Sequence, residues 1–253
     1  MATYKKRGYK PKNKEEEAEI DVQDSTTAEV FSTLDEGASK TEEWVSRNQN
    51  YILGVIGIAA VAILGYLAYV QFVSKPKEAE AANEMYYPQQ YFDQALASET
   101  AKDSLFNLAL EGAEGKYGFL KIIEEYSGTK AANLANYAAG VSYLNMKNYQ
   151  KAIEHLENFS SDEAILGAMA KGNIGNAFMQ LDQPTEALGY YEKAISHSTN
   201  EFTTPKFLYK AGVTALELNQ NDKALGFFER IKEEFPSSEE ARTIDAFIGM
   251  AKK

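Results

Sequence analysis

The feature that most constrains the fold is a motif that occurs three times in the C-terminal half of this 253-residue chain. Gly140, Gly175 and Gly212 recur 35 and 37 residues apart, and each is followed by an alanine twelve residues later and a large apolar residue sixteen residues later. A period of this length is typical of stacked helix pairs. We predict that the small residues lie where the two helices of a pair cross closely, with the large residue packed beside them.

The arrangement resembles the tetratricopeptide repeat, a pair of antiparallel helices about 34 residues long. The stretch Tyr117–Asn133 aligns without gaps on Gly226–Arg242, which indicates a partial repeat before the three. Because one repeat cannot bury its apolar face alone, neighbouring repeats stack and the last one needs a cap. We therefore predict an all-α fold with a tetratricopeptide-repeat-like α-solenoid at 78–253. Its expected parts are a partial repeat at about 96–129, repeats at about 133–166, 168–201 and 205–238, and a capping helix at 239–251.

A second strong feature is the stretch from Tyr51 to Val73, which contains no charged residue. About 20 apolar residues of helix are needed to cross the hydrocarbon core of a bilayer, and a buried helix of a soluble protein rarely sustains such a run. A cleaved signal sequence does not fit, because the apolar core is too long and about fifty residues precede it. We predict a transmembrane helix at 50–73.

The segment before this span is divided by charge. Residues 1–14 contain six Lys or Arg and no acid, and the next ten contain six acids and no base. Such blocks are typical of disordered tails, which we predict for 1–24. Apolar residues then recur every three or four positions, which predicts an amphipathic helix at 25–49. Its stripe includes Phe31, Leu34 and Trp44, which either dock on a partner or the bilayer surface or simply face solvent.

The basic cluster at residues 5–14 determines the predicted orientation, because Lys and Arg in short flanking segments favour the cytoplasmic side. We place the N-terminus in the cytoplasm, a single span in the lipid bilayer and residues 78–253 outside the cytoplasm. The formal net charge of −11 disfavours nucleic acid as a partner, since binding needs cationic surface that displaces counterions.

Catalytic motifs are missing from the sequence. The chain has no cysteine, which excludes thiolate chemistry. Its only histidines, His155 and His197, do not form a His-Glu-x-x-His motif, and packing or solvated roles are predicted for both. The glycine-rich stretch Gly112–Gly118 has the wrong spacing for a phosphate loop. We therefore expect a protein that is not an enzyme and that has no cofactor and no metal site.

A binding surface is the better prospect, since stacked helix pairs present a concave groove lined by their first helices. The predicted groove is mainly apolar and aromatic and suits peptides or partner helices. Two alternatives are that several of these residues pack against the next repeat, or that the chain's own segment Glu78–Ala97 fills the groove. The predicted lining residues are Leu134, Tyr137, Val141, Leu144, Met169, Asn173, Asn176, Met179, Lys206, Tyr209 and Val213.

Chaperone-binding members of the repeat family hold a C-terminal carboxylate with Lys and Asn at set positions. Tyr137 and Val141 occupy two of those positions here, so this carboxylate clamp is not expected.

The order of tail, span and repeats, with the segments TEEWVSRNQNYILGVIGIAAVAILGYLAYVQF and YSGTKAANLANYAAGVSYLNMKNYQKAI, resembles the YfgM/AncM-like family of bacterial single-span inner-membrane tetratricopeptide-repeat proteins. The second segment is similar to Bacteroidetes members. The resemblance implies an ancillary subunit of the Sec translocon whose periplasmic domain works with a PpiD-like membrane-anchored chaperone on unfolded secretory clients. The alternative is a structural scaffold subunit of another envelope complex, for secretion, division or outer-membrane assembly.

Overall fold

The computed structural model describes residues 42–253, and every regular element in this range is a helix, which confirms the predicted all-α class. Backbone contacts divide the chain into two units, Met1–Val70 and Gln71–Lys253. The predicted tail at 1–24 and most of the predicted amphipathic helix, with Phe31 and Leu34, lie outside the described residues. Trp44 is described and is 61% exposed.

Helix α2 (Gln49–Tyr69) is the main described element of the first unit, and none of its residues is buried. A π-helical turn, η1 (Val70–Ser74), follows it and leads into α3 (Lys75–Glu84). Within residues 42–253, the continuous helical run Gln49–Ala97 is the one helix long and apolar enough to cross a membrane, and its most apolar stretch is not buried at all. The core helix of a soluble domain would bury such a surface.

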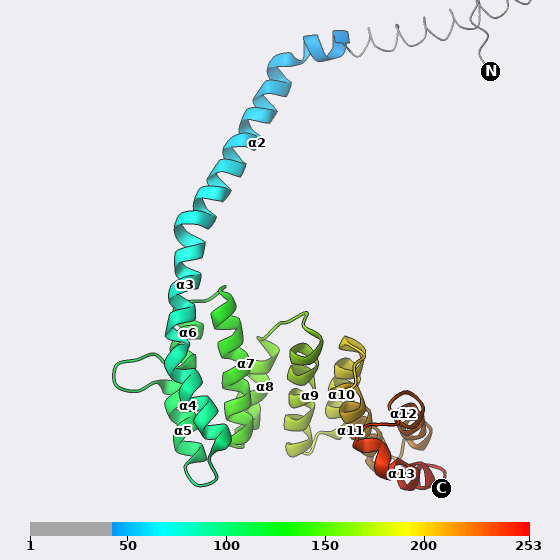
Figure 1. The fold of residues 1–253 in the computed structure, drawn as a ribbon. Coiled ribbons are helices and arrows are strands. Elements are labelled where there is room, and N and C mark those ends of the chain that lie inside the picture. Colours follow the sequence, from blue (N-terminus) through cyan, green and yellow to red (C-terminus); the bar gives the residue numbers. More distant parts are fainter. Residues whose placement is uncertain (1–41) are drawn as a thin grey trace, which may run out of the picture. The chain divides into compact units, whose positions relative to one another are not determined.

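The second unit is a stack of antiparallel helices that follow one another in chain order (Figure 1). The closest packing joins elements that are neighbours in sequence, such as α7 with α8 and α9 with α10, which is the contact pattern of a solenoid. After α3, its elements are α4 (Tyr86–Ala97), α5 (Lys102–Glu111), α6 (Phe119–Glu125), α7 (Lys130–Asn145), α8 (Tyr149–Glu157), α9 (Ala164–Gln180), α10 (Pro184–His197), α11 (Thr204–Glu217), α12 (Asn221–Glu234), η2 (Glu240–Thr243) and α13 (Ile244–Ala251).

The repeated glycines lie at the crossings of the helix pairs, as the sequence predicts. A Cβ atom added to any of the three would collide with the buried large side chain sixteen residues later. Glycine therefore permits the close approach that lets this side chain lie across the first helix of the repeat. The three pairs are Gly140–Leu156, Gly175–Tyr191 and Gly212–Phe228.

The first helix of each repeat ends in the same turn, which the sequence analysis did not identify. Lys147, Asp182 and Asn219 follow α7, α9 and α11 with left-handed φ values of 60, 58 and 57°. In each turn the next residue donates its N–H to the carbonyl five residues earlier, at 2.8, 3.0 and 2.8 Å. This Schellman arrangement satisfies carbonyls at the helix end and reverses the chain into the second helix.

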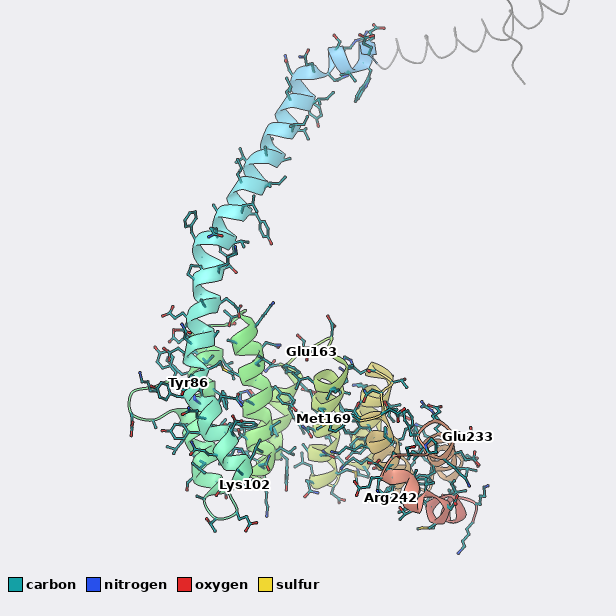
Figure 2. All side chains as sticks on the ribbon, in the orientation of Figure 1. Tyr86, Lys102, Glu163, Met169, Glu233 and Arg242 are labelled. Carbon is teal, nitrogen blue, oxygen red and sulfur yellow. The ribbon has the colours of Figure 1, made fainter. Side chains whose placement is uncertain are left out.

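Side chains from successive helices fill the space within the stack (Figure 2). At its N-terminal end the ring centroids of Phe106 and Phe119 lie 5.8 and 6.0 Å from that of Phe92, and all three side chains are buried. Helix α4 packs on α5, and α5 packs on both α6 and α7. These aromatic contacts build the hydrophobic core on which the first full repeat rests.

Helix α3 is attached to the start of α7 by a carboxylate. Glu78 accepts hydrogen bonds from the backbone N–H of Lys130 at 3.0 Å and of Ala131 at 3.3 Å. Lys77 donates to the carbonyl of Ser127 at 3.2 Å. A helix N-terminus has unpaired N–H groups and a partial positive charge, so an anionic carboxylate stabilises it.

We expect Glu78→Gln to lower the free energy of unfolding by about 1 kcal/mol, because the amide retains the shape of the side chain but loses its charge. Urea titration of the full-length protein in detergent, followed by circular dichroism, measures the change. Glu111→Gln is the control, since Glu111 is exposed at the C-terminal end of α5, where loss of a negative charge is not expected to destabilise the helix. Equal losses in the two variants would show that the contact with α7 contributes nothing.

Candidate functional site

A cavity of about 610 Å³ runs across the first helices of the three repeats. It lies toward the C-terminal ends of α7 and α9 and along the middle of α11, and the start of α8 and the middle of α10 contribute to it. We call this cavity the groove. It is lined by Leu144, Asn145, Lys147, Tyr149, Asn176, Met179, Gln180, Tyr191, Tyr209, Lys210, Val213 and Thr214.

The structure brings together five of the predicted lining residues: Leu144, Asn176, Met179, Tyr209 and Val213. They come from three different helices, which the repeat register places side by side. They come together because each lies within about one turn of the repeated glycine of its own helix, so all five are at a similar height along the parallel first helices.

The other six predicted residues do not line the groove. The ring of Tyr137 packs against Phe159, with 5.1 Å between centroids, and Leu134 is 45% exposed near the start of α7. A helix rises about 1.5 Å per residue, so Leu134 lies roughly 15 Å from the level of Leu144. Val141 and Met169 pack against the core (Met169 is labelled in Figure 2). The side-chain oxygen of Asn173 accepts a hydrogen bond from Asn176, and Lys206 is exposed.

Several lining residues were missed by sequence reasoning, and they make the groove more polar than predicted. Lys210 is the most informative of them. It stands four residues after Lys206 and three before Val213, so helical spacing alone places it on their face. The other missed residues are Asn145, Lys147, Tyr149, Gln180, Tyr191 and Thr214.

A hydrogen-bond network centred on Asn176 crosses the floor of the groove. Its side-chain oxygen accepts from Lys210 Nζ at 2.8 Å and from Tyr191 Oη at 3.0 Å, and its amide nitrogen donates to Asn173 at 3.2 Å. Burial raises the pKa of Tyr191 far above its usual range, so the phenol remains a neutral donor. The network links α9, α10 and α11 and holds the Lys210 ammonium in place.

The wall of the groove on α11 is supported by the C-terminal helix. The ring of Tyr209 meets that of Phe247 on α13 edge to face, with 5.1 Å between centroids. Elsewhere in the lining Tyr149 donates to Gln180 at 3.2 Å and joins α8 to α9. The lining thus combines aromatic side chains with the polar network around Asn176.

Both histidines connect helices within the stack. The ring of His155 stacks on Tyr143, with 5.4 Å between centroids, and burial lowers its pKa. His197 Nε2 lies 3.1 Å from the backbone carbonyl of Glu163. Among residues 42–253 no group of three or more His, Asp or Glu side chains is placed to hold a metal ion.

The chain's own segment Glu78–Ala97 does not fill the groove. It forms α3 and α4, which pack against α7 and α5, and none of its residues belongs to the lining. The groove is therefore open to another molecule as far as the described residues are concerned.

Comparison with known families supports the repeat assignment. Residues 137–201 and 173–239 each match the tetratricopeptide repeat family. No curated protein sequence matches the chain. The two matches run from the middle of α7 to the end of α12, so the second unit contains tetratricopeptide repeats, as the sequence predicts. Such repeats mark it as a protein–protein interaction module, since their stacked first helices form extended binding surfaces.

Proposed function

We propose that this chain is a membrane-anchored interaction module in which α2 spans a bilayer and the groove binds segments of partner proteins. The groove itself carries the proposal: it crosses three repeats, presents aromatic, aliphatic and amide groups, and is not occupied by α3 or α4. Adaptable Met and Tyr side chains beside fixed amide groups suit recognition of a peptide segment. The uncharged, unburied surface of α2 supports the anchor.

We also propose where the protein is located and which complex it joins. The basic N-terminal cluster supports a cytoplasmic N-terminus, with the repeat unit in the periplasm of a bacterial inner-membrane protein. The resemblance to the YfgM/AncM-like family supports an ancillary subunit of the Sec translocon that works with a PpiD-like chaperone on emerging secretory proteins. The division into 1–24, 25–49, 50–73 and 78–253 belongs to the same proposal.

Photocrosslinking in living cells tests this function. A photoreactive residue replaces Gln180, an exposed lining residue, and a matched variant carries it at Gln150, which is exposed on α8 outside the lining. We expect position 180, and not position 150, to capture translocon subunits, the chaperone or nascent secretory chains. Capture of division or outer-membrane assembly components would favour the scaffold alternative. Equal labelling at both positions would overturn the role of the groove.

A further inference from the structure

The charge of the groove contrasts with that of the chain. The protein has a formal net charge of −11, yet the lining contains Lys147 and Lys210 and no Asp or Glu. Lys206 stands one helical turn before Lys210 on the same face. The groove is therefore a local cationic site on an acidic protein, and charge complementarity favours an acidic occupant.

Lys210 is the most buried of these cations, since Lys147 and Lys206 are exposed. Its ammonium is half-buried, and none of the ion pairs among the described residues includes it. Its polar partner is the neutral oxygen of Asn176 at 2.8 Å. Burial, and to a smaller extent the nearby charge of Lys206, lowers the pKa of Lys210. Besides this oxygen, the ammonium contacts the face of the Tyr191 ring, 5.9 Å from its centroid. Neither partner carries a negative charge, so the half-buried ammonium gains from the arrival of an anion.

We propose that the groove recognises an aspartate or glutamate side chain within the bound segment, with Lys210 as its carboxylate-binding residue and Asn176 as the residue that positions Lys210. This inference rests on the proposed function and names the kind of segment that the groove selects. The neighbouring Met179, Tyr209 and Val213 suit aliphatic or aromatic residues beside the acid.

The geometry favours an internal acidic side chain over a chain terminus. From Lys210 the lining extends across to Asn176 and Met179 on α9 and along α11 to Val213, so the ammonium lies among other lining groups that a segment can contact. In addition, the first repeat carries Tyr137 and Val141, and not Lys and Asn, at two of the positions that a terminal-carboxylate clamp uses.

Lys210→Met is a suitable variant because it removes the charge and leaves the rest of the network in place. Methionine retains the aliphatic stem, and Asn176 Oδ1 keeps its hydrogen bond from Tyr191 at 3.0 Å. Lys151→Met is the matched control, since Lys151 is exposed on α8 and outside the lining. Thermal melts of both variants in detergent should overlay that of the original protein.

The test is a selection of random peptides, displayed with both ends blocked by flanking sequence, on the full-length protein in detergent. The original protein and Lys151→Met are expected to enrich peptides containing Asp or Glu, and Lys210→Met is expected to lose this enrichment. Replacing the acid of an enriched peptide by its amide should weaken binding to the original protein about tenfold or more and leave binding to Lys210→Met nearly unchanged. Added salt should weaken the binding of the acidic peptide to the original protein and leave the binding of the amide peptide nearly unchanged.

The outcomes separate this inference from the function on which it rests. Peptides that bind in the groove without acidic enrichment would overturn the inference and leave the function standing. Failure to recover any peptide whose binding is abolished by Val213→Arg, which blocks the groove, would overturn both. Binding that requires a free C-terminal carboxylate would overturn the commitment to an internal side chain. Protection of the Lys210 amine from acylation by a bound acidic peptide, but not by its amide counterpart, would support the assignment independently.

Discussion

Gly172→Ala is expected to lower the free energy of unfolding of the C-terminal unit by about 1–3 kcal/mol, the usual cost of overpacking a tight core. A Cβ at this position on α9 would collide with the ring of Phe207 on α11, which is 1% exposed. Alanine favours a helix over glycine by up to about 1 kcal/mol, so a net loss shows that the collision dominates.

The sign of this effect should reverse when Phe207 is shortened. In the Phe207→Ala background the added methyl group enters the vacated space, so Gly172→Ala is expected to stabilise that variant. Urea titrations of the four proteins in detergent give the coupling free energy. Gly226→Ala on α12 is the control, because nothing lies within 4 Å of its added Cβ, and it should stabilise by about 0.5–1 kcal/mol. Additive effects of Gly172→Ala and Phe207→Ala would contradict the contact between the repeats.

Phe247→Ala is expected to lower the free energy of unfolding by about 3 kcal/mol, because it removes the ring through which α13 packs on aromatic side chains of α11 and α12. The ring centroid of Phe247 lies 5.1 Å from that of Tyr209 and 5.5 Å from that of Phe228. Without the Phe247 ring, the last repeat loses apolar cover that a terminal repeat requires. Met250→Ala is the matched control, since Met250 lies on the same helix and is 55% exposed, and its effect should stay within about 0.5 kcal/mol.

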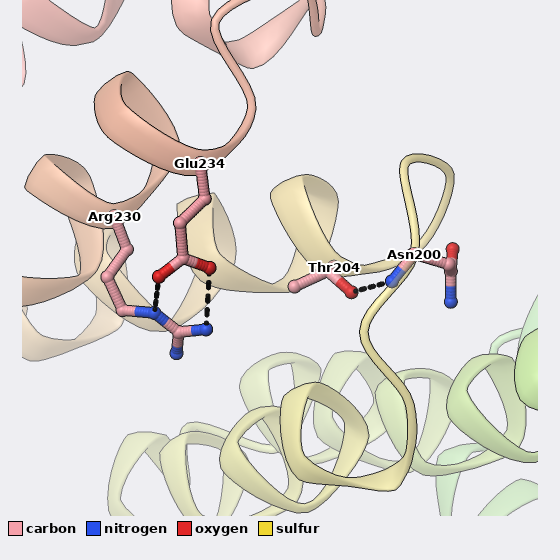
Figure 3. A network of polar contacts seen from close by, with 4 residues as sticks. All are labelled: Asn200, Thr204, Arg230 and Glu234. Atoms are coloured by element: carbon pink, nitrogen blue, oxygen red, sulfur yellow. Dashed lines mark hydrogen bonds and ion pairs between the residues drawn. The ribbon is translucent and has the colours of Figure 1, made fainter.

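The same variant should also weaken peptide binding, because Tyr209 loses the ring that supports it in the groove wall. The Arg230–Glu234 ion pair on α12 cannot replace the packing that Phe247 provides. Arg230 pairs with Glu234 through two hydrogen bonds of 3.0 and 3.1 Å on α12 (Figure 3), but this surface pair contributes only about 0–1 kcal/mol. Unchanged stability in Phe247→Ala would mean that α13 is not a cap.

The repeat architecture was predictable because its signal is local. A glycine and the large residue sixteen positions later belong to one helix pair, so their contact is encoded within a short window, as for Gly140 and Leu156. The turns after the first helices were not predicted, because Lys147, Asp182 and Asn219 adopt left-handed φ values without being glycine. There the helix-end hydrogen bonds stabilise a conformation that residue type alone disfavours.

Periodicity and composition predict the class of the fold, the apolar stretch around α2 and the helices whose residues can face a groove. The packing of the repeats sets where along those helices the groove lies. It placed Leu144 and Tyr209 in the lining and left Leu134 and Tyr137 outside it. It also set Lys210 beside Asn176, 34 residues earlier in the chain. The physical reason is that a side chain's neighbours across a stack depend on how successive repeats pack, which no single repeat's sequence specifies.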